Sequence, residues 1–230
     1  MRFTVPTPVH GWRTFAGEVG IIVLGVLIAL GAEQVVGDWH WRHEVADFRE
    51  SVRAEMSHDL WTYPYRAQQK RCIAARLDEL QHWLDSWRAG RPLRLSGQIR
   101  IPVSIVIRTS AWDGRDAATL AHMNRSERLD YGFLYSEFAN NEVHRLDERA
   151  AWIDLAGFTG ATSLDHQDQM RLQTLILRAR LRDDRIDSNA GRFLKRAAKM
   201  GLHPVQQSDT APIDPSFCKP LLAPEAAAGR

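Results

Sequence analysis

One apolar run, residues 19–32 (VGIIVLGVLIALGA), constrains the fold of this 230-residue chain more than any other feature. As a helix the run would be about 21 Å long, somewhat short of the ~20 residues that usually cross a bilayer. Trp12 precedes it and Trp39 follows it. A continuous helix between these tryptophans would measure about 40 Å, close to the bilayer thickness with headgroups, and tryptophans at both ends are typical of the two interfaces. We therefore predict an uncleaved membrane-spanning helix over residues 14–41.

A signal peptide is the alternative interpretation of this run. Its length also fits a signal-peptide core, and Gly31-Ala32 offers a small-residue cleavage site. The helical pattern continues past Ala32 without a break, whereas mature secreted proteins rarely begin inside a helix. We therefore favour the anchor.

One face of the predicted span carries two small residues between two carboxylates: Glu18, Gly25, Ala29 and Glu33. Gly25 and Ala29 form a small-xxx-small step, which allows another helix to approach closely. Glycine and alanine are also common in spans that pack against nothing. The face is thus a candidate for self-association or for contact with a membrane partner.

Residues 17–30 (GEVGIIVLGVLIAL) resemble the opening of a group of uncharacterised bacterial single-pass membrane proteins. These proteins carry a GE(V/I)xxIVLGVLIAL-type span followed by a helical domain. The resemblance covers about residues 12–42 and implies membership of that group and a place in the bacterial inner membrane. It implies no activity.

The charges on the two sides of the span do not by themselves determine its orientation. Arg2 and Arg13 precede the span, and Arg42, Arg49 and Arg53 follow it, so the positive-inside rule gives nearly a tie. Long C-terminal domains are translocated largely regardless of charge. We therefore expect the N-terminal tail, residues 1–13, in the cytoplasm and the C-terminal domain in the periplasm.

Beyond the span, apolar residues recur at spacings of three and four, the pattern of helices that bury one face. The stripes predict long helices up to Tyr63, over 73–87, over 126–156 from a cap at Ser126, and from a cap at Ser163 to Met200, with a short helix at 112–123. Pro64 is expected to interrupt or kink the first of these. The predicted buried face of the helix over 126–156 consists of Ala139, Val143, Leu146, Ala150 and Ile153.

Residues 99–107 alternate between apolar and polar instead, and Pro102 limits them to an edge strand or an extended segment. The predicted fold is all-α: one N-terminal transmembrane helix followed by an antiparallel helical bundle with one short extended segment. The bundle is expected over residues 42–204, and residues 205–230, rich in Pro and Ala, are expected to form a flexible tail.

Known catalytic and metal-binding patterns give no usable lead. The chain has no GxSxG elbow, phosphate-binding glycine loop or HExxH motif. Glu55…His58 and Glu79…His82 have the Glu-x-x-His spacing of di-iron bundles, but on a helical wheel both pairs point away from the predicted core. We expect no catalytic residue, metal site or cofactor, and we do not expect an enzyme.

The best functional lead is a cationic stripe on the last predicted helix, about 80° wide. Its members are Arg171, Arg178, Arg182, Arg185, Arg192, Arg196 and Lys199. Such a stripe could bind an acidic partner, anionic headgroups or a phosphate-bearing ligand. It could equally be a solvated face paired with acids of the preceding helix: Glu142, Asp147, Glu148 and Asp154. The net charge of +2 and the absence of interleaved aromatics argue against nucleic acid.

The two cysteines leave two possibilities open. Cys72 and Cys218 could form a disulfide in an oxidising compartment, tying the tail to the second helix, or could be one buried and one free thiol.

Two function hypotheses result. The first is a membrane-anchored helical interaction or scaffold module that docks on an envelope or membrane partner. The second is a ligand-sensing domain that binds a small anion and acts through a partner protein.

Overall fold

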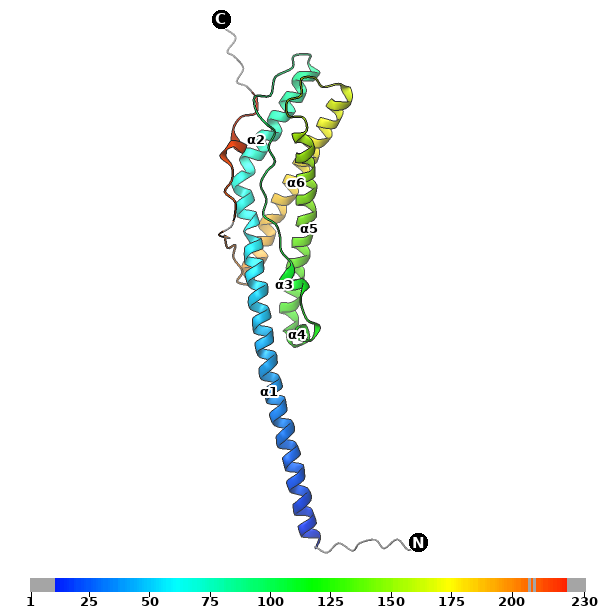
Figure 1. Ribbon diagram of the computed structural model, residues 1–230, viewed down its shortest axis with the longest axis vertical. Coiled ribbons are helices and arrows are strands. Elements are labelled where there is room, and N and C mark those ends of the chain that lie inside the picture. Colours follow the sequence, from blue (N-terminus) through cyan, green and yellow to red (C-terminus); the bar gives the residue numbers. More distant parts are fainter. Residues whose placement is uncertain (1–10, 207, 209, 223–230) are drawn as a thin grey trace, which may run out of the picture. The chain divides into compact units, whose positions relative to one another are not determined.

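The computed structural model describes residues 11–206, 208 and 210–222. Residues 1–10 of the predicted N-terminal tail and residues 223–230 of the predicted C-terminal tail lie outside this part. Of the described residues, 74% are helical and none forms a strand, which confirms the all-α prediction. The elements are α1 (Trp12–Leu60), α2 (Thr62–Arg88), α3 (Ser110–Asp113), α4 (Ala117–His122), α5 (Arg125–Ala156), α6 (His166–Lys199) and the 3-10 turn η1 (Pro215–Cys218) (Figure 1).

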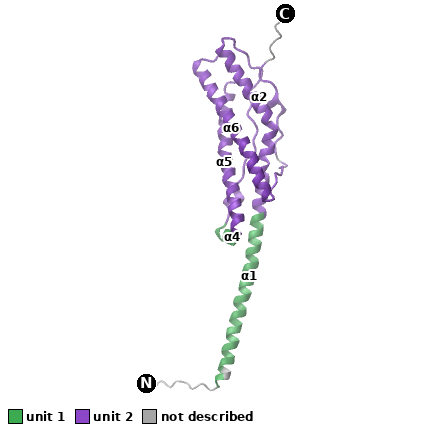
Figure 2. Ribbon diagram, turned by 180° about the vertical axis from the view of Figure 1, so that it is seen from behind, with its two compact units in different colours: residues 1–49, 116–123 green, residues 50–115, 124–230 purple. Residues whose placement is uncertain are grey.

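The chain divides into two compact units, which Figure 2 shows in different colours. The first unit comprises residues 1–49 and 116–123, and the second comprises residues 50–115 and 124–230. The first unit therefore contains most of α1 together with α4. The second contains the last turns of α1 with α2, α3, α5, α6 and η1.

The first unit holds the long apolar N-terminal helix that the sequence predicts. An 18-residue window of it has a mean hydropathy of 2.3, and none of that window is buried. By length and composition it could cross a membrane. Its aliphatic side chains are open, as Ile21 at 74% exposure illustrates. In the same unit the ring of His122, at the end of α4, stacks on Trp41 with centroids 4.3 Å apart.

The second unit is built on three helical rods. In Figure 1, α6 runs antiparallel to both α2 and α5, and α6 packs along each of them. The core between them includes the fully buried Leu80, Trp83, Trp152 and Leu172. Burying one such side chain stabilises the fold by about 1.5–3 kcal/mol before entropy is counted.

The junction between α1 and α2 lies just before Pro64, where the sequence predicts an interruption. Trp61 alone separates the helices and has α-helical dihedrals, and its N–H donates to the His58 carbonyl at 3.0 Å. The end of α1 and α2 therefore follow the same direction as one rod and do not fold back as a hairpin. Pro64 lies in the first turn of α2. Its missing N–H costs little stability there, because the first N–H groups of a helix have no partner within that helix.

The buried face predicted for α5 is wrong. Val143, Leu146 and Ile153 are 51–64% exposed. The buried side chains of α5 are instead Tyr131, Leu134, Tyr135, Phe138, Asn141, Glu148, Ala151, Trp152 and Leu155. The aromatic face is the one buried, because large rings remove more apolar area from water than alanine and valine do.

Residues 91–109 connect α2 to α3 without a strand, apart from one isolated bridge between Leu95 and Leu222. Side chains of the helices take the place of a partner strand. Gln69 of α2 accepts from the Val103 N–H at 3.0 Å and donates to the Val103 carbonyl at 2.8 Å. The Ile99 N–H donates to the Thr159 hydroxyl at 3.1 Å. These bonds satisfy the backbone of an irregular segment.

The C-terminal segment that was expected to be flexible packs against α2 over residues 215–222. Cys218 forms a disulfide with Cys72 of α2, and Phe217 is buried. Arg76 donates to the Phe217 carbonyl at 3.0 Å, and Glu79 accepts from the Leu221 N–H at 2.9 Å. The Pro- and Ala-rich composition does not predict an ordered segment here. The order comes from the disulfide and from the hydrogen bonds of Arg76 and Glu79.

Candidate functional site

The predicted cationic stripe lies on α6, whose two ends are well defined. The Asp165 carboxylate accepts from the Asp168 N–H at 2.7 Å, and the Asp168 carboxylate accepts in return from the Asp165 N–H. This capping box begins the helix two residues after the expected cap, Ser163. The helix ends at Lys199, and Gly201 follows with φ +68°, the left-handed conformation that glycine tolerates.

The arginines in the N-terminal half of the stripe are paired with aspartates of α5. Arg171 lies 3.6 Å from Asp154, and both Arg178 and Arg182 bind Asp147. The hydrogen bonds from Arg178 and Arg182 lower the pKa of Asp147 to about 2. Here the alternative interpretation holds, since these arginines form ion pairs along the contact between two helices. Exposed pairs of this kind contribute about 0–1 kcal/mol each.

The C-terminal half of the stripe is different. Arg185, Arg192 and Lys199 form no ion pair with any residue that the structure describes, nor does Lys195, which the sequence prediction missed. Arg196 alone is paired, with Asp130 at 2.9 Å. Each of these five side chains is exposed.

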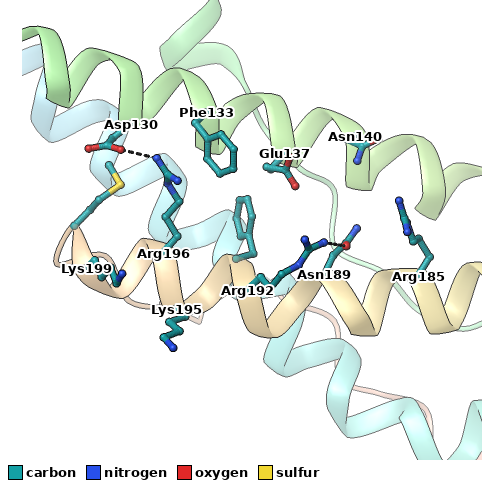
Figure 3. Close-up of a pocket in the computed structure, with 12 residues that line it drawn as sticks. Asp130, Phe133, Glu137, Asn140, Arg185, Asn189, Arg192, Lys195, Arg196 and Lys199 are labelled. Carbon is teal, nitrogen blue, oxygen red and sulfur yellow. Dashed lines mark hydrogen bonds and ion pairs between the residues drawn. The ribbon is translucent and has the colours of Figure 1, made fainter.

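These cations line a groove of about 720 Å³ between the start of α5 and the end of α6 (Figure 3). Asp130 and Glu137 are the carboxylates that line it, so the lining carries an excess of three positive charges. Arg196 lies over the Phe133 ring at 4.0 Å, and Arg192 donates to the Asn189 side chain at 2.7 Å. Two of the cations are thus held in position before anything binds.

The groove can bind carboxylates or phosphates through charge-assisted hydrogen bonds. Arginine presents several N–H donors in a planar fork, which suits both groups. The exposed phenyl edge of Phe133 adds an apolar contact surface on the α5 side. A signal for Lys195 was present in the sequence, since Arg192, Lys195 and Lys199 follow one another at helical spacings of three and four.

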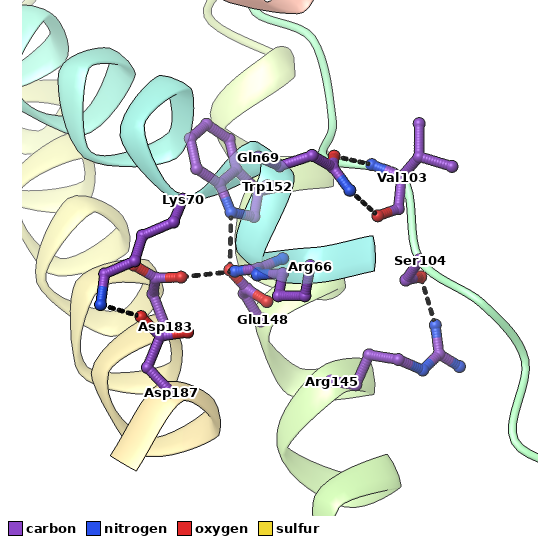
Figure 4. A network of polar contacts seen from close by, with 10 residues as sticks. All are labelled: Arg66, Gln69, Lys70, Val103, Ser104, Arg145, Glu148, Trp152, Asp183 and Asp187. Atoms are coloured by element: carbon purple, nitrogen blue, oxygen red, sulfur yellow. Dashed lines mark hydrogen bonds and ion pairs between the residues drawn. The ribbon is translucent and has the colours of Figure 1, made fainter. Parts of the chain in front are cut away.

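A second group of charges lies inside the second unit (Figure 4). Arg66 of α2 binds Glu148 of α5, and it binds Asp183 of α6 at 2.7 Å. Trp152 also donates to Glu148, at 3.3 Å. Burial alone would lower the pKa of Arg66, but the two carboxylates outweigh burial and raise it. Burial raises the pKa of both Glu148 and Asp183, against the opposing effect of Arg66.

This group joins all three rods of the second unit, so we assign it a structural role. It also corrects the sequence interpretation of Glu148, which was expected to pair with the stripe at the surface. Glu148 is 2% exposed and faces α2, while the neighbouring Asp147 faces the arginines of α6. Adjacent helix positions differ by about 100° in direction, which separates the two carboxylates.

The other predicted positions are placed as follows. Cys72 and Cys218 are joined, so the thiol alternative does not hold in this structure. Glu55 accepts from Ser110, Ala111 and Tyr135, and Glu79 binds Arg76, so neither acid of the Glu-x-x-His pairs points to a shared ligand. The described residues contain no group of three or more potential metal ligands.

The face with Glu18, Gly25, Ala29 and Glu33 is exposed along its whole length. A Cβ placed on Gly25 would meet nothing within 4 Å. The structure of one chain therefore leaves room for another helix at this face.

Comparisons of the chain with protein-family models, with curated proteins and with solved structures found no match.

Proposed function

We propose that this chain is a membrane-anchored interaction module that binds an acidic partner through the groove between α5 and α6. The observation that carries the proposal is the uneven pairing of the stripe. Asp147 and Asp154 pair with all three arginines of its N-terminal half, while Arg185, Arg192 and Lys199 of its C-terminal half, together with the neighbouring Lys195, have no acidic partner among the described residues. Unpaired arginines gathered in one concave site repel one another, which an acidic partner would relieve.

Exposure of the cations favours a macromolecular partner over a small anion. Sites for small ligands usually bury about 70–90% of the ligand surface. Arg185, Arg192 and Lys195 are all exposed, so a small anion bound to them would keep much of its hydration. The sensor hypothesis remains the second candidate. It predicts that inorganic phosphate binds the full chain in detergent and that replacing Arg192 weakens this binding. The module hypothesis instead predicts negligible phosphate binding at physiological salt.

The location belongs to the same proposal. We place the chain in a bacterial inner membrane, with the apolar part of α1 as its one span and the helical domain in the periplasm as a bundle supported by the extended segment 91–109. The disulfide supports an oxidising compartment, because such bonds persist there and are rare in the cytosol. The resemblance of residues 17–30 to bacterial single-pass proteins supports the membrane and the source.

Topology is tested by fusing alkaline phosphatase or a fluorescent protein after Arg230. We expect phosphatase activity and no fluorescence. The opposite result would place the domain in the cytoplasm and leave the cysteines reduced.

The binding function is tested by site-specific photo-crosslinking in cells that express the full chain. A photoreactive residue at Asn140, which lines the groove and carries no charge, should give one discrete protein adduct. The same residue at Arg71, exposed on α2, is the control and should give none. Replacing Arg185 and Arg192 by glutamine should remove the Asn140 adduct. An adduct of unchanged yield would contradict a charge-based site, and no adduct at all would contradict the module.

A further inference from the structure

The outward face of the α5–α6 pair follows a repeated three-residue pattern. In the ion pairs that Asp147 and Asp154 of α5 form with α6, the paired residue on each helix is preceded by an exposed aliphatic residue and followed by a buried residue. The triplets are Leu146-Asp147-Glu148 and Ile153-Asp154-Leu155 in α5, and Met170-Arg171-Leu172, Leu177-Arg178-Ala179 and Leu181-Arg182-Asp183 in α6.

The pattern places the exposed aliphatic residues of these five triplets on one face. Successive helix residues are about 100° apart, so the residue before the ion pair lies on the side opposite to the buried residue after it. Because α5 and α6 run antiparallel, the same order of residues points to the same side of the pair in both helices. The line of ion pairs therefore runs along the middle of a face bordered by aliphatic side chains.

This face is divided along its length. Its apolar half consists of Val143, Leu146, Ile153, Met170, Leu177 and Leu181, each 51–64% exposed. Its other half is the basic groove, which begins at Arg185, one turn beyond Leu181, and where Leu129, next to Asp130, is the exposed aliphatic residue that follows the same pattern. The aliphatic residues of α5 at positions 143–153 are the ones whose spacing predicts a buried face.

We infer that this face binds one amphipathic helix of a partner protein, with aliphatic side chains on the apolar half and acidic side chains in the basic groove. The inference rests on the proposed function and adds the shape and chemistry of the partner segment. A helix that is apolar on opposite sides is typical of one buried within a larger bundle. α5 buries its aromatic side in the core, and the partner helix would cover its aliphatic side. Helices commonly recognise a groove between two others through side chains spaced at three and four residues.

Charge argues against a second copy of this chain as the occupant. The face has an apolar half and a cationic half, and its acids Asp147 and Asp154 are already paired. Docked on a second copy over its whole length, it would bring arginines against arginines or against leucines. Both arrangements bury unpaired charge, which is unfavourable.

The lengthwise division also argues against a lipid surface. Helices that lie on anionic membranes carry lysine and arginine beside the apolar stripe along their length, together with tryptophan or phenylalanine that enters the interface. Here the apolar half is aliphatic and its arginines are paired with acids, while the unpaired cations lie at the other end. A partner with leucines in one half and glutamates in the other matches this distribution.

The test uses the full chain in detergent micelles and two synthetic 20-residue helical peptides held in shape by a side-chain staple. The first carries leucines at spacings of three and four in one half and glutamates in the other, and it is made in both chain directions. The second has the same composition with the two kinds of residue mixed along its length. Fluorescence anisotropy measures binding to the wild-type chain, to Leu177→Gln/Leu181→Gln and to Arg192→Gln/Lys195→Gln. Val106→Gln and Arg94→Gln, exposed residues of the α2–α3 segment, are the matched controls.

We expect one direction of the divided peptide to bind at least about tenfold more tightly than the mixed peptide. Each double variant should weaken its binding by about tenfold or more, because each removes part of a contact made only in the complex. The two control variants should bind as the wild type does.

The other outcomes separate the inference from the proposed function. If the leucine variant binds normally and the arginine variant does not, the groove binds acids but the partner is no amphipathic helix, and the inference fails alone. If both variants bind normally, the groove is no binding site and the proposed function fails as well. If phosphatidylglycerol vesicles bind with the same residue dependence and neither peptide does, the face is a lipid-binding surface and the inference is overturned.

Discussion

Asp59, near the end of α1, is the carboxyl group whose burial should govern the pH dependence of stability. Its side chain is fully buried. One oxygen accepts from the Arg108 N–H at 3.1 Å, and the other has no hydrogen-bond partner among the described residues. Burial raises the pKa of Asp59 from its ordinary 3.8 to about 7, opposed by the bond from Arg108 and reinforced by the charge of Glu55.

The sign of the effect follows from proton binding. Between about pH 4 and pH 7 the folded chain keeps a proton on Asp59 that the unfolded chain has lost. The free energy of unfolding therefore falls as pH rises through this window, by up to about 1.4 kcal/mol per pH unit. The loss approaches about 4 kcal/mol and levels off above pH 7, where both states are ionised.

The substitution Asp59→Asn isolates this contribution. The amide oxygen can still accept from Arg108, and the group no longer ionises. The amide NH₂ would lack a partner as the second carboxyl oxygen does, at a cost of about 1–3 kcal/mol at all pH values. Relative to the wild type, the variant should therefore gain stability by up to about 1.4 kcal/mol per pH unit between pH 5 and pH 7, and it should be the more stable of the two at pH 8.

Urea unfolding of the full chain in detergent, followed by tryptophan fluorescence at pH 5, 6, 7 and 8, measures this difference. Other buried carboxyls such as Glu148 contribute to the slope of both proteins and cancel in the comparison. If the difference in unfolding free energy between variant and wild type stays constant over this range, Asp59 is not protonated in the folded chain and the reasoning is refuted.

Three further perturbations have definite expected results. Cys218→Ser opens a loop that spans 146 positions, so the chain-entropy relation predicts a loss of about 5 kcal/mol in urea unfolding; a midpoint equal to that of the wild type would contradict it. Arg66→Met leaves two carboxylates buried together and should cost about 3–5 kcal/mol near neutral pH, with part of the loss recovered at low pH; a loss independent of pH would argue against the ionic cause. Gly25→Leu should abolish detergent-resistant oligomers by blocking close helix approach, whereas Gly20→Leu, equally open within one chain, should leave them intact; equal behaviour of the two variants would mean that this face does not pack.

Much of the helical architecture could be predicted because α2 and α6 each bury a single apolar stripe. In α6 the apolar residues at helical spacings, among them Leu172, Leu175, Ala179 and Phe193, form the buried face. In α2 the same holds for Ile73, Leu77 and Leu80. The hydrophobic period of about 3.6 residues determines the direction of burial wherever the opposite side is polar.

α5 shows where periodicity alone is insufficient. Its sequence offers two apolar stripes, one aliphatic through Val143 and Leu146 and one aromatic through Tyr135, Phe138 and Trp152. Both stripes have helical spacing, so the hydrophobic period does not predict which of them is buried. The aromatic stripe also supplies polar groups that find partners in the core: Tyr135 donates to Glu55, and Trp152 donates to Glu148. Burial of these rings leaves the aliphatic stripe at the surface.

The location of the candidate site depends on the register of α6 against α5. The residue pattern of a single helix does not predict this register. The cationic stripe is uniform in sequence, and acids occur along all of α5. The pairs Arg171–Asp154, Arg178–Asp147 and Arg196–Asp130 define one antiparallel register. In that register Arg185 lies opposite Asn140 rather than opposite an aspartate. A shift by one helical turn would move the unpaired charge elsewhere on the stripe, so the site is a property of the packed pair of helices and not of α6 alone.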